Sequence, residues 1–124
     1  MPNEMNHAEV ALIDALYAEI TESTTERSTC EYFCKIADLP ELMERHHVRS
    51  GFRNTRCPYL HGINYEFVKI QLGQRLKEAA EINNMTLKIF CFDVPQRYSN
   101  CFKVSATFLV QATFERKDDN HETD

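Results

Sequence analysis

The chain has 124 residues, of which 43% are hydrophobic and 27% charged, with only three glycines and four prolines. This length fits one domain, and the composition excludes collagen-like, mucin-like and low-complexity chains. The net charge of −5 argues against a dedicated nucleic-acid binder, and no apolar run approaches the length of a membrane span. We therefore predict one α+β domain over residues 1–116 and a polar, disordered tail at 117–124.

The cysteine count and the first residues bear on the cellular compartment. Five cysteines cannot all pair in disulfides, and residues 1–7 lack the basic start of a secretory signal peptide. We therefore expect an intracellular protein, cytoplasmic or nuclear, with reduced thiols, no membrane association and no bound cofactor.

Helical spacing dominates the N-terminal half of the sequence. Asn6 and Glu9 have the spacing of a capping box, and the apolar residues that follow recur every three or four positions, which predicts a helix over 7–22. Ser28 and Glu31 repeat the capping spacing and predict the start of a second helix. A third helix is expected to begin at Asp38 and to end before residue 51.

The C-terminal half changes from helical to strand-like spacing. A long helix is predicted from Asn64 to about residue 83, with Asn83-Asn84 suited to its C-terminal cap. Gly73 lies inside this helix, where glycine marks the close packing of another element. Residues 86–94 and 102–114 are rich in Thr, Val, Ile and Phe, which predicts an antiparallel β-hairpin.

The expected architecture has N-terminal helices and one long helix packed on this C-terminal hairpin, with the sheet extended by another strand or by a second subunit. Pairing of Val94 with Cys101 would place the helices over Leu87, Ile89 and Cys91. The opposite face would then carry four apolar residues, Phe90, Phe92, Val94 and Leu109. Because such a face is too apolar for open water, we predict that it binds a protein partner or a second copy of the chain.

The charge is distributed unevenly. Residues 1–44 carry 10 acidic and 2 basic side chains, residues 45–77 carry 7 basic and 1 acidic, and residues 78–124 carry 5 basic and 8 acidic. The middle segment is a candidate anion or nucleic-acid site formed by Arg45, Arg49, Arg53, Arg56 and Lys69. Alternatively, the segment docks on the chain's own acidic N-terminal helices, through Glu19, Glu22 or Glu31.

One group of residues has the chemistry of metal ligands. Cys30 and Cys34 would share one face of the predicted second helix, and Cys57 and His61 repeat that spacing in a loop, with His46 or His47 as further candidates. Thiolate and imidazole ligands together suit Zn²⁺. The other interpretation is that Cys30 and Cys34 are small core residues, and we favour this one because the spacing is unlike that of zinc fingers.

Motifs that carry a reaction mechanism are absent, including the glycine-rich phosphate loops, the nucleophile elbow and HExxH. We therefore predict a non-catalytic module that binds a protein partner through an apolar sheet face or edge. The first alternative is a nucleic-acid-binding module, for RNA rather than DNA, that uses the basic 45–77 segment and is stabilised by zinc. The second is a small enzyme in which His46, His47 or Cys57 acts.

Overall fold

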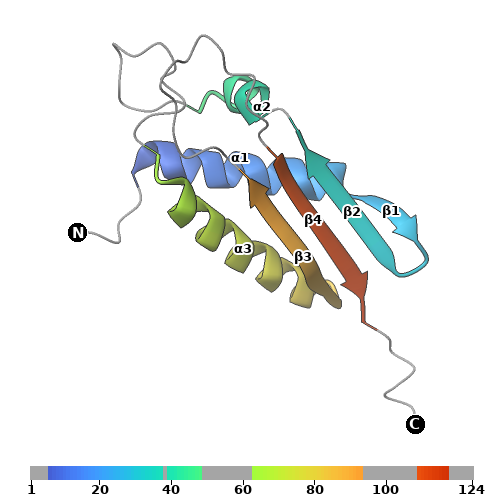
Figure 1. Ribbon diagram of the computed structural model, residues 1–124. Coiled ribbons are helices and arrows are strands. Elements are labelled where there is room, and N and C mark those ends of the chain that lie inside the picture. Colours follow the sequence, from blue (N-terminus) through green and yellow to red (C-terminus); the bar gives the residue numbers. More distant parts are fainter. Residues whose placement is uncertain (1–5, 38, 49–62, 94–108, 118–124) are drawn as a thin grey trace, which may run out of the picture.

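The computed structural model describes residues 6–37, 39–48, 63–93 and 109–117. Their elements, in chain order, are α1 (His7–Ser23), β1 (Thr25–Ser28), β2 (Glu31–Ile36), α2 (Leu39–Arg45), α3 (Tyr65–Ile82), β3 (Met85–Asp93) and β4 (Leu109–Arg116). The strands form one antiparallel sheet in the order β1-β2-β4-β3. The helices α1 and α3 lie on the same face of this sheet (Figure 1). The predicted α+β class is confirmed.

Side chains at the helix ends account for where α1 and α3 begin and stop. Asn6 and Glu9 form the expected capping box at the start of α1. The second carboxylate oxygen of Glu9 accepts a hydrogen bond of 2.7 Å from the backbone N–H of Asn64, the N-cap of α3. One buried carboxylate therefore joins the first turns of both helices. Asn84, with a φ of 59°, turns the chain from α3 into β3.

Residues 25–36 form two strands and not the predicted second helix. Ser28 and Glu31 flank the turn of a β1–β2 hairpin, so their capping-like spacing does not start a helix. β2 pairs along its whole length with β4, from Glu31 opposite Glu115 to Ile36 opposite Val110. This pairing between distant segments outweighs the local helical spacing, because β-branched and aromatic side chains gain most from packing on a half-buried sheet. The extension of the predicted hairpin is thus supplied by the chain itself.

The hydrophobic core lies between the sheet and the helices. In α3 the buried residues recur at spacings of three or four residues, which turns one stripe of that helix toward the sheet. The largest fully buried side chains are Leu12, Leu16, Ile20, Leu39, Leu42, Met43, Val68, Leu72, Leu76 and Val110. The helices of the described ranges are all too short or too polar to span a membrane.

An irregularity in β3 sets its register against β4. Leu87 lies opposite Phe114, but the next residue to pair is Ile89, which lies opposite Thr113. Lys88 is therefore an extra residue on one strand, which is the defining feature of a β-bulge. Its ammonium group reaches Glu115, 3.5 Å away.

The bulge decides which side chains of β3 face the helices. Phe90 and Phe92 pack against the core, so the prediction that they lie on the opposite face is wrong. The reason is that one extra residue shifts the alternation of all later side chains by one position. Leu109 alternates with the buried residues of β4 and so lies on the face that no described helix covers, whereas Val94 and Cys101 are outside the described residues.

Gly73 marks a close approach between α3 and β3, as its place inside a helix predicts. A Cβ atom at this position would lie 3.2 Å from two carbons of the Phe90 ring. The ring therefore packs on the backbone of α3. It fills the space that the side chain of any residue larger than glycine would occupy at position 73.

The bulge gives a direct test of the register. Phe90→Ala is expected to lower the free energy of unfolding by about 2–3 kcal/mol, because the ring packs against the core. Ile89→Ala should cost less than about 1 kcal/mol, since half of that side chain is exposed. Urea unfolding followed by circular dichroism measures both values, as the chain has no tryptophan. A larger loss for Ile89→Ala than for Phe90→Ala would contradict the register.

Candidate functional site

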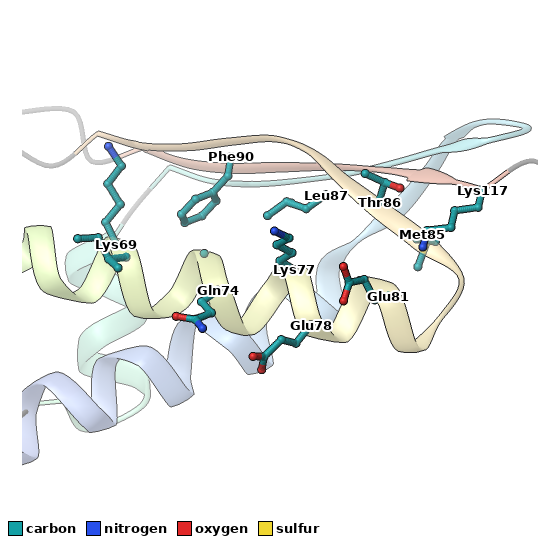
Figure 2. Close-up of a pocket in the computed structure, with 12 residues that line it drawn as sticks. Lys69, Gln74, Lys77, Glu78, Glu81, Met85, Thr86, Leu87, Phe90 and Lys117 are labelled. Atoms are coloured by element: carbon teal, nitrogen blue, oxygen red, sulfur yellow. The ribbon is translucent and has the colours of Figure 1, made fainter.

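An open groove of about 740 Å³ runs between α3 and β3. Two other cavities of the described residues hold about 270 and 220 Å³. Only the first of these three lies within the usual size of ligand sites, which is about 300–1,000 Å³. It is lined by Lys69, Ile70, Gly73, Gln74, Lys77, Glu78, Glu81, Met85, Thr86, Leu87, Phe90 and Lys117. Figure 2 shows Leu87 and Phe90 pointing from the strand toward the helix and Lys69 and Lys77 pointing from the helix toward the strand, whereas Gln74 and Glu78 point away from it.

The helix side of the groove is formed by residues at helical spacing. Lys69, Gly73 and Lys77 follow one another at four-residue intervals and so lie along one side of α3. Gly73 leaves the centre of this row without a side chain, and the Phe90 ring occupies the space above it. Ile70 lies beside the row and is 54% exposed. The groove therefore has an apolar middle with an ammonium group on each side.

The other side of the groove is the edge of the sheet. β3 is the last strand in the order β1-β2-β4-β3 and pairs only with β4 among the described strands. In an antiparallel strand, alternate residues point their N–H and C=O groups to opposite sides, so the outer edge of β3 presents unpaired backbone groups. At one end, the N–H of Lys117 donates to the carbonyl of Asn84, 3.0 Å away.

The lysines of the groove differ from most other basic side chains of the described residues. Arg27, Arg45, Arg75 and Lys88 all form ion pairs with carboxylates. Within the described ranges, the three groove lysines (Lys69, Lys77 and Lys117) form no such pair. The groove also holds Glu78 and Glu81, so its lining carries a net charge of +1.

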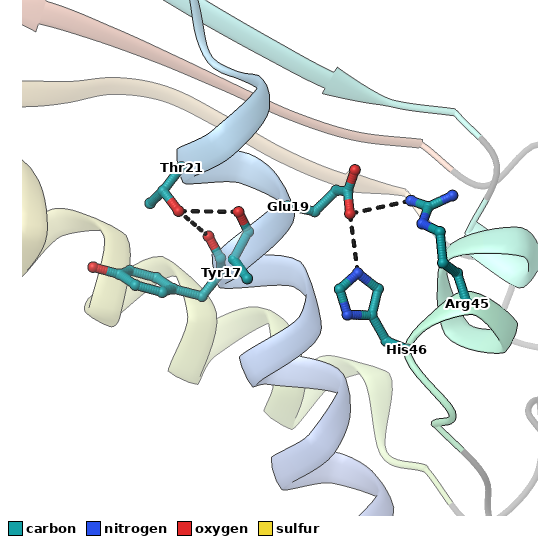
Figure 3. Close-up of polar contacts among 6 residues, drawn as sticks. Tyr17, Glu19, Thr21, Arg45 and His46 are labelled. Carbon is teal, nitrogen blue, oxygen red and sulfur yellow. Dashed lines mark hydrogen bonds and ion pairs between the residues drawn. The ribbon is translucent and has the colours of Figure 1, made fainter.

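The candidate anion site of the basic segment is not assembled in the described part of the chain. Arg45 lies 3.1 Å from the carboxylate of Glu19, and the ring of His46 lies 3.0 Å from the same oxygen (Figure 3). Arg45 thus docks on α1, as the alternative interpretation of the basic segment expects. Lys69 lies in the groove beside β3. Arg49, Arg53 and Arg56 are outside the described residues.

The metal-ligand candidates do not share a helix face, because the segment that carries them is not helical. Cys30 is exposed in the β1–β2 turn, whereas Cys34 is buried in β2. Burial raises the pKa of the Cys34 thiol, and the nearby Glu19 carboxylate raises it further. This favours the thiol over the thiolate that metal binding and nucleophilic attack require. Cys57 and His61 are outside the described residues, among which there is no cluster of three metal-binding side chains.

The candidate enzyme residues are placed only in part. His46 is held by Glu19, and His47 follows it with a φ of 59°, in the left-handed region, directly after α2. The hydrogen bond from His46 is the main cause that lowers the pKa of Glu19, and Arg45 lowers it further, while partial burial acts in the opposite direction. Glu19 therefore joins α1 to the end of α2 through two contacts, an ion pair with Arg45 and a hydrogen bond with His46.

The sequence analysis does not predict the groove, although it names four of its residues for other reasons. It places Phe90 on the sheet face away from the helices, Leu87 under the helices, Gly73 at a close helix contact and Lys69 in the basic segment. The sequence pattern that could have predicted the groove lies on the solvent side of the long helix. There Ile70 interrupts a run of polar residues, and two lysines lie four residues before and after a glycine. Comparison of the chain with protein-family models, with curated proteins and with solved structures finds no significant match.

The Glu19 cluster gives a prediction for stability against pH. Glu19→Gln should lower the free energy of unfolding near pH 7 by about 1 kcal/mol, because the charged hydrogen-bond acceptor is lost. Since the folded pKa lies below the ordinary value of 4.5, the carboxylate stabilises the fold above that value and loses this effect as the pH falls through the folded pKa. Wild type and variant should therefore converge in strong acid, as measured by urea unfolding across the pH range.

The control for this experiment is Glu22→Gln, which removes an exposed carboxylate of the same helix. It should change stability by less than about 0.5 kcal/mol at every pH. A stability gap between wild type and Glu19→Gln that is as large in strong acid as at pH 7 would show that the ion pairs with Arg45 and His46 do not cause it.

Proposed function

We propose that this protein is a non-catalytic interaction module that binds an extended segment of a partner protein along the outer edge of β3. The observation that carries this proposal is the position of the groove, which runs beside an edge strand whose outer side pairs with no described strand. An added strand would pair with that edge and direct every second side chain into the groove.

This mode of recognition divides affinity and specificity between backbone and side chains. Main-chain hydrogen bonds to the edge strand supply affinity for any extended segment, and side-chain pockets select its sequence. The apolar part of the groove, where Ile70 lies beside Gly73 and Phe90, suits an aliphatic side chain of the ligand. The exposure of Ile70 in the free protein adds to the free energy that such a contact would release.

The other edge of the sheet, β1, is less suited to pairing with a partner strand than β3. β1 has four residues, all exposed, while β3 has nine. A short edge strand is one of the means by which proteins avoid unwanted pairing. The Arg27 guanidinium also lies over the Phe33 ring, 4.6 Å from its centroid, and forms an ion pair with Glu31. The longer edge therefore offers more backbone groups to a partner.

The groove chemistry favours binding over catalysis. Among the described residues, its lining has no histidine, cysteine, serine or aspartate, and the charged groups are three lysines and two glutamates. The basic segment offers less support for a nucleic-acid function, because Arg45 already pairs with Glu19.

Two substitutions in α3 test the proposal. Peptides selected from a random displayed library for binding to the wild type should bind Ile70→Asp at least about tenfold more weakly, because the change removes apolar contact and places a charge in the groove. Ile82→Asp makes the same change at an 85% exposed position of the same helix that does not line the groove, and it should bind as the wild type does. Fluorescence anisotropy with labelled peptides measures both affinities.

Two results would contradict the proposal. The first is a library that yields no binder, or only binders that do not distinguish Ile70→Asp from Ile82→Asp. The second is a dimer that dissociates in Ile70→Asp but not in Ile82→Asp, measured by analytical ultracentrifugation. That dimer would identify a second copy of the chain, and not a partner protein, as the occupant of the groove.

A further inference from the structure

The spacing of the helix row matches the spacing of an extended chain. Residues four apart in an α-helix are separated by about 6 Å along the axis. Alternate side chains of a β-strand, which point to the same side, are separated by about 6.6–6.8 Å. The helix α3 runs alongside β3 over the length of the groove (Figure 2), so a strand added to β3 would run alongside the helix row as well. Three successive groove-facing side chains of the ligand would then face Lys69, Gly73 and Lys77 in turn.

The outer two of these three positions are positively charged, and the central one is apolar. Lys69 and Lys77 present ammonium groups, and no carboxylate of the described residues forms an ion pair with either. Gly73 lies between them, with the Phe90 ring above its backbone and Ile70 at its side. An acidic side chain of the ligand would therefore be favoured at each outer position and an apolar one at the centre.

Resting on the proposed function, we infer that the ligand segment has the pattern acidic-x-apolar-x-acidic. Its two carboxylates face Lys69 and Lys77, and its apolar side chain packs against Ile70 and the Phe90 ring that covers Gly73. The intervening positions point to the sheet face that no described helix covers and are free to vary. Glu81 limits the pattern at one end, because it follows Lys77 by four residues and would repel a third carboxylate at the next groove-facing position.

Three labelled peptides test this pattern: acetyl-GTETLTETG-amide, its glutamine version GTQTLTQTG and its lysine version GTKTLTKTG. The acidic peptide should bind the wild type at least about fivefold more tightly than the lysine peptide at low ionic strength, with the glutamine peptide between them. The difference should shrink as salt is raised, because the groove is open to solvent. Fluorescence anisotropy at two salt concentrations measures it.

Charge reversal in the protein supplies the matched variants. Lys69→Glu combined with Lys77→Glu should reverse the order, so that the lysine peptide binds more tightly than the acidic one. Lys35→Glu changes an exposed lysine of β2 outside the groove and should keep the wild-type order. Thermal unfolding followed by circular dichroism confirms that each variant is folded. Because neither Lys69 nor Lys77 holds an ion pair within the described residues, the double variant should melt within a few degrees of the wild type.

The outcomes separate this inference from the function on which it rests. Equal affinity of the wild type for the three peptides, or an unchanged order in the double variant, overturns the charge pattern. If library-selected peptides still depend on Ile70 in that case, the interaction function stands and only the ligand pattern is wrong. If no peptide depends on Ile70, the proposed function fails as well.

Discussion

The bulge at Lys88 is the constraint on which the rest of the described structure depends. By inserting one residue between Leu87 and Ile89, it turns Phe90 toward α3 and leaves Ile89 half exposed on the other face. Without it, the later aromatic side chains would point away from the helices, and nothing would fill the space above Gly73. The bulge therefore both completes the core and forms the apolar middle of the groove.

The topology explains why the two edges of the sheet differ. A helix followed by an antiparallel pair of strands occurs twice, as α1-β1-β2 and as α3-β3-β4, and the second strand of each unit lies at the centre of the sheet. This arrangement leaves the first strand of each unit at an edge. The two edges differ in length, because β1 has four residues and β3 has nine. The longer edge also has the groove beneath it, so backbone pairing and side-chain selection are available at the same place.

Part of the candidate site could be predicted from the sequence. The groove includes two of the candidate site residues that the sequence analysis names, Phe90 and Lys69. Their surroundings were not predictable, because the face of a strand depends on a register that one extra residue reverses. The basic segment shows the same limit, since Arg45 pairs with a carboxylate 26 positions earlier in the chain, and only the packing of α2 on α1 brings Glu19 within 3.1 Å.

The sequence by itself determined the features whose causes lie within a few residues. The capping box of Asn6 and Glu9, the apolar stripe of α3 and the left-handed turn at Asn84 all follow from local hydrogen bonds and helical spacing. Only the tertiary structure decided that residues 31–36 form a strand, that β3 is an edge, and that the bulge turns Phe90 toward α3. These outcomes depend on pairing with β4, which is far away in the chain, and the free energy of such contacts exceeds that of local preferences.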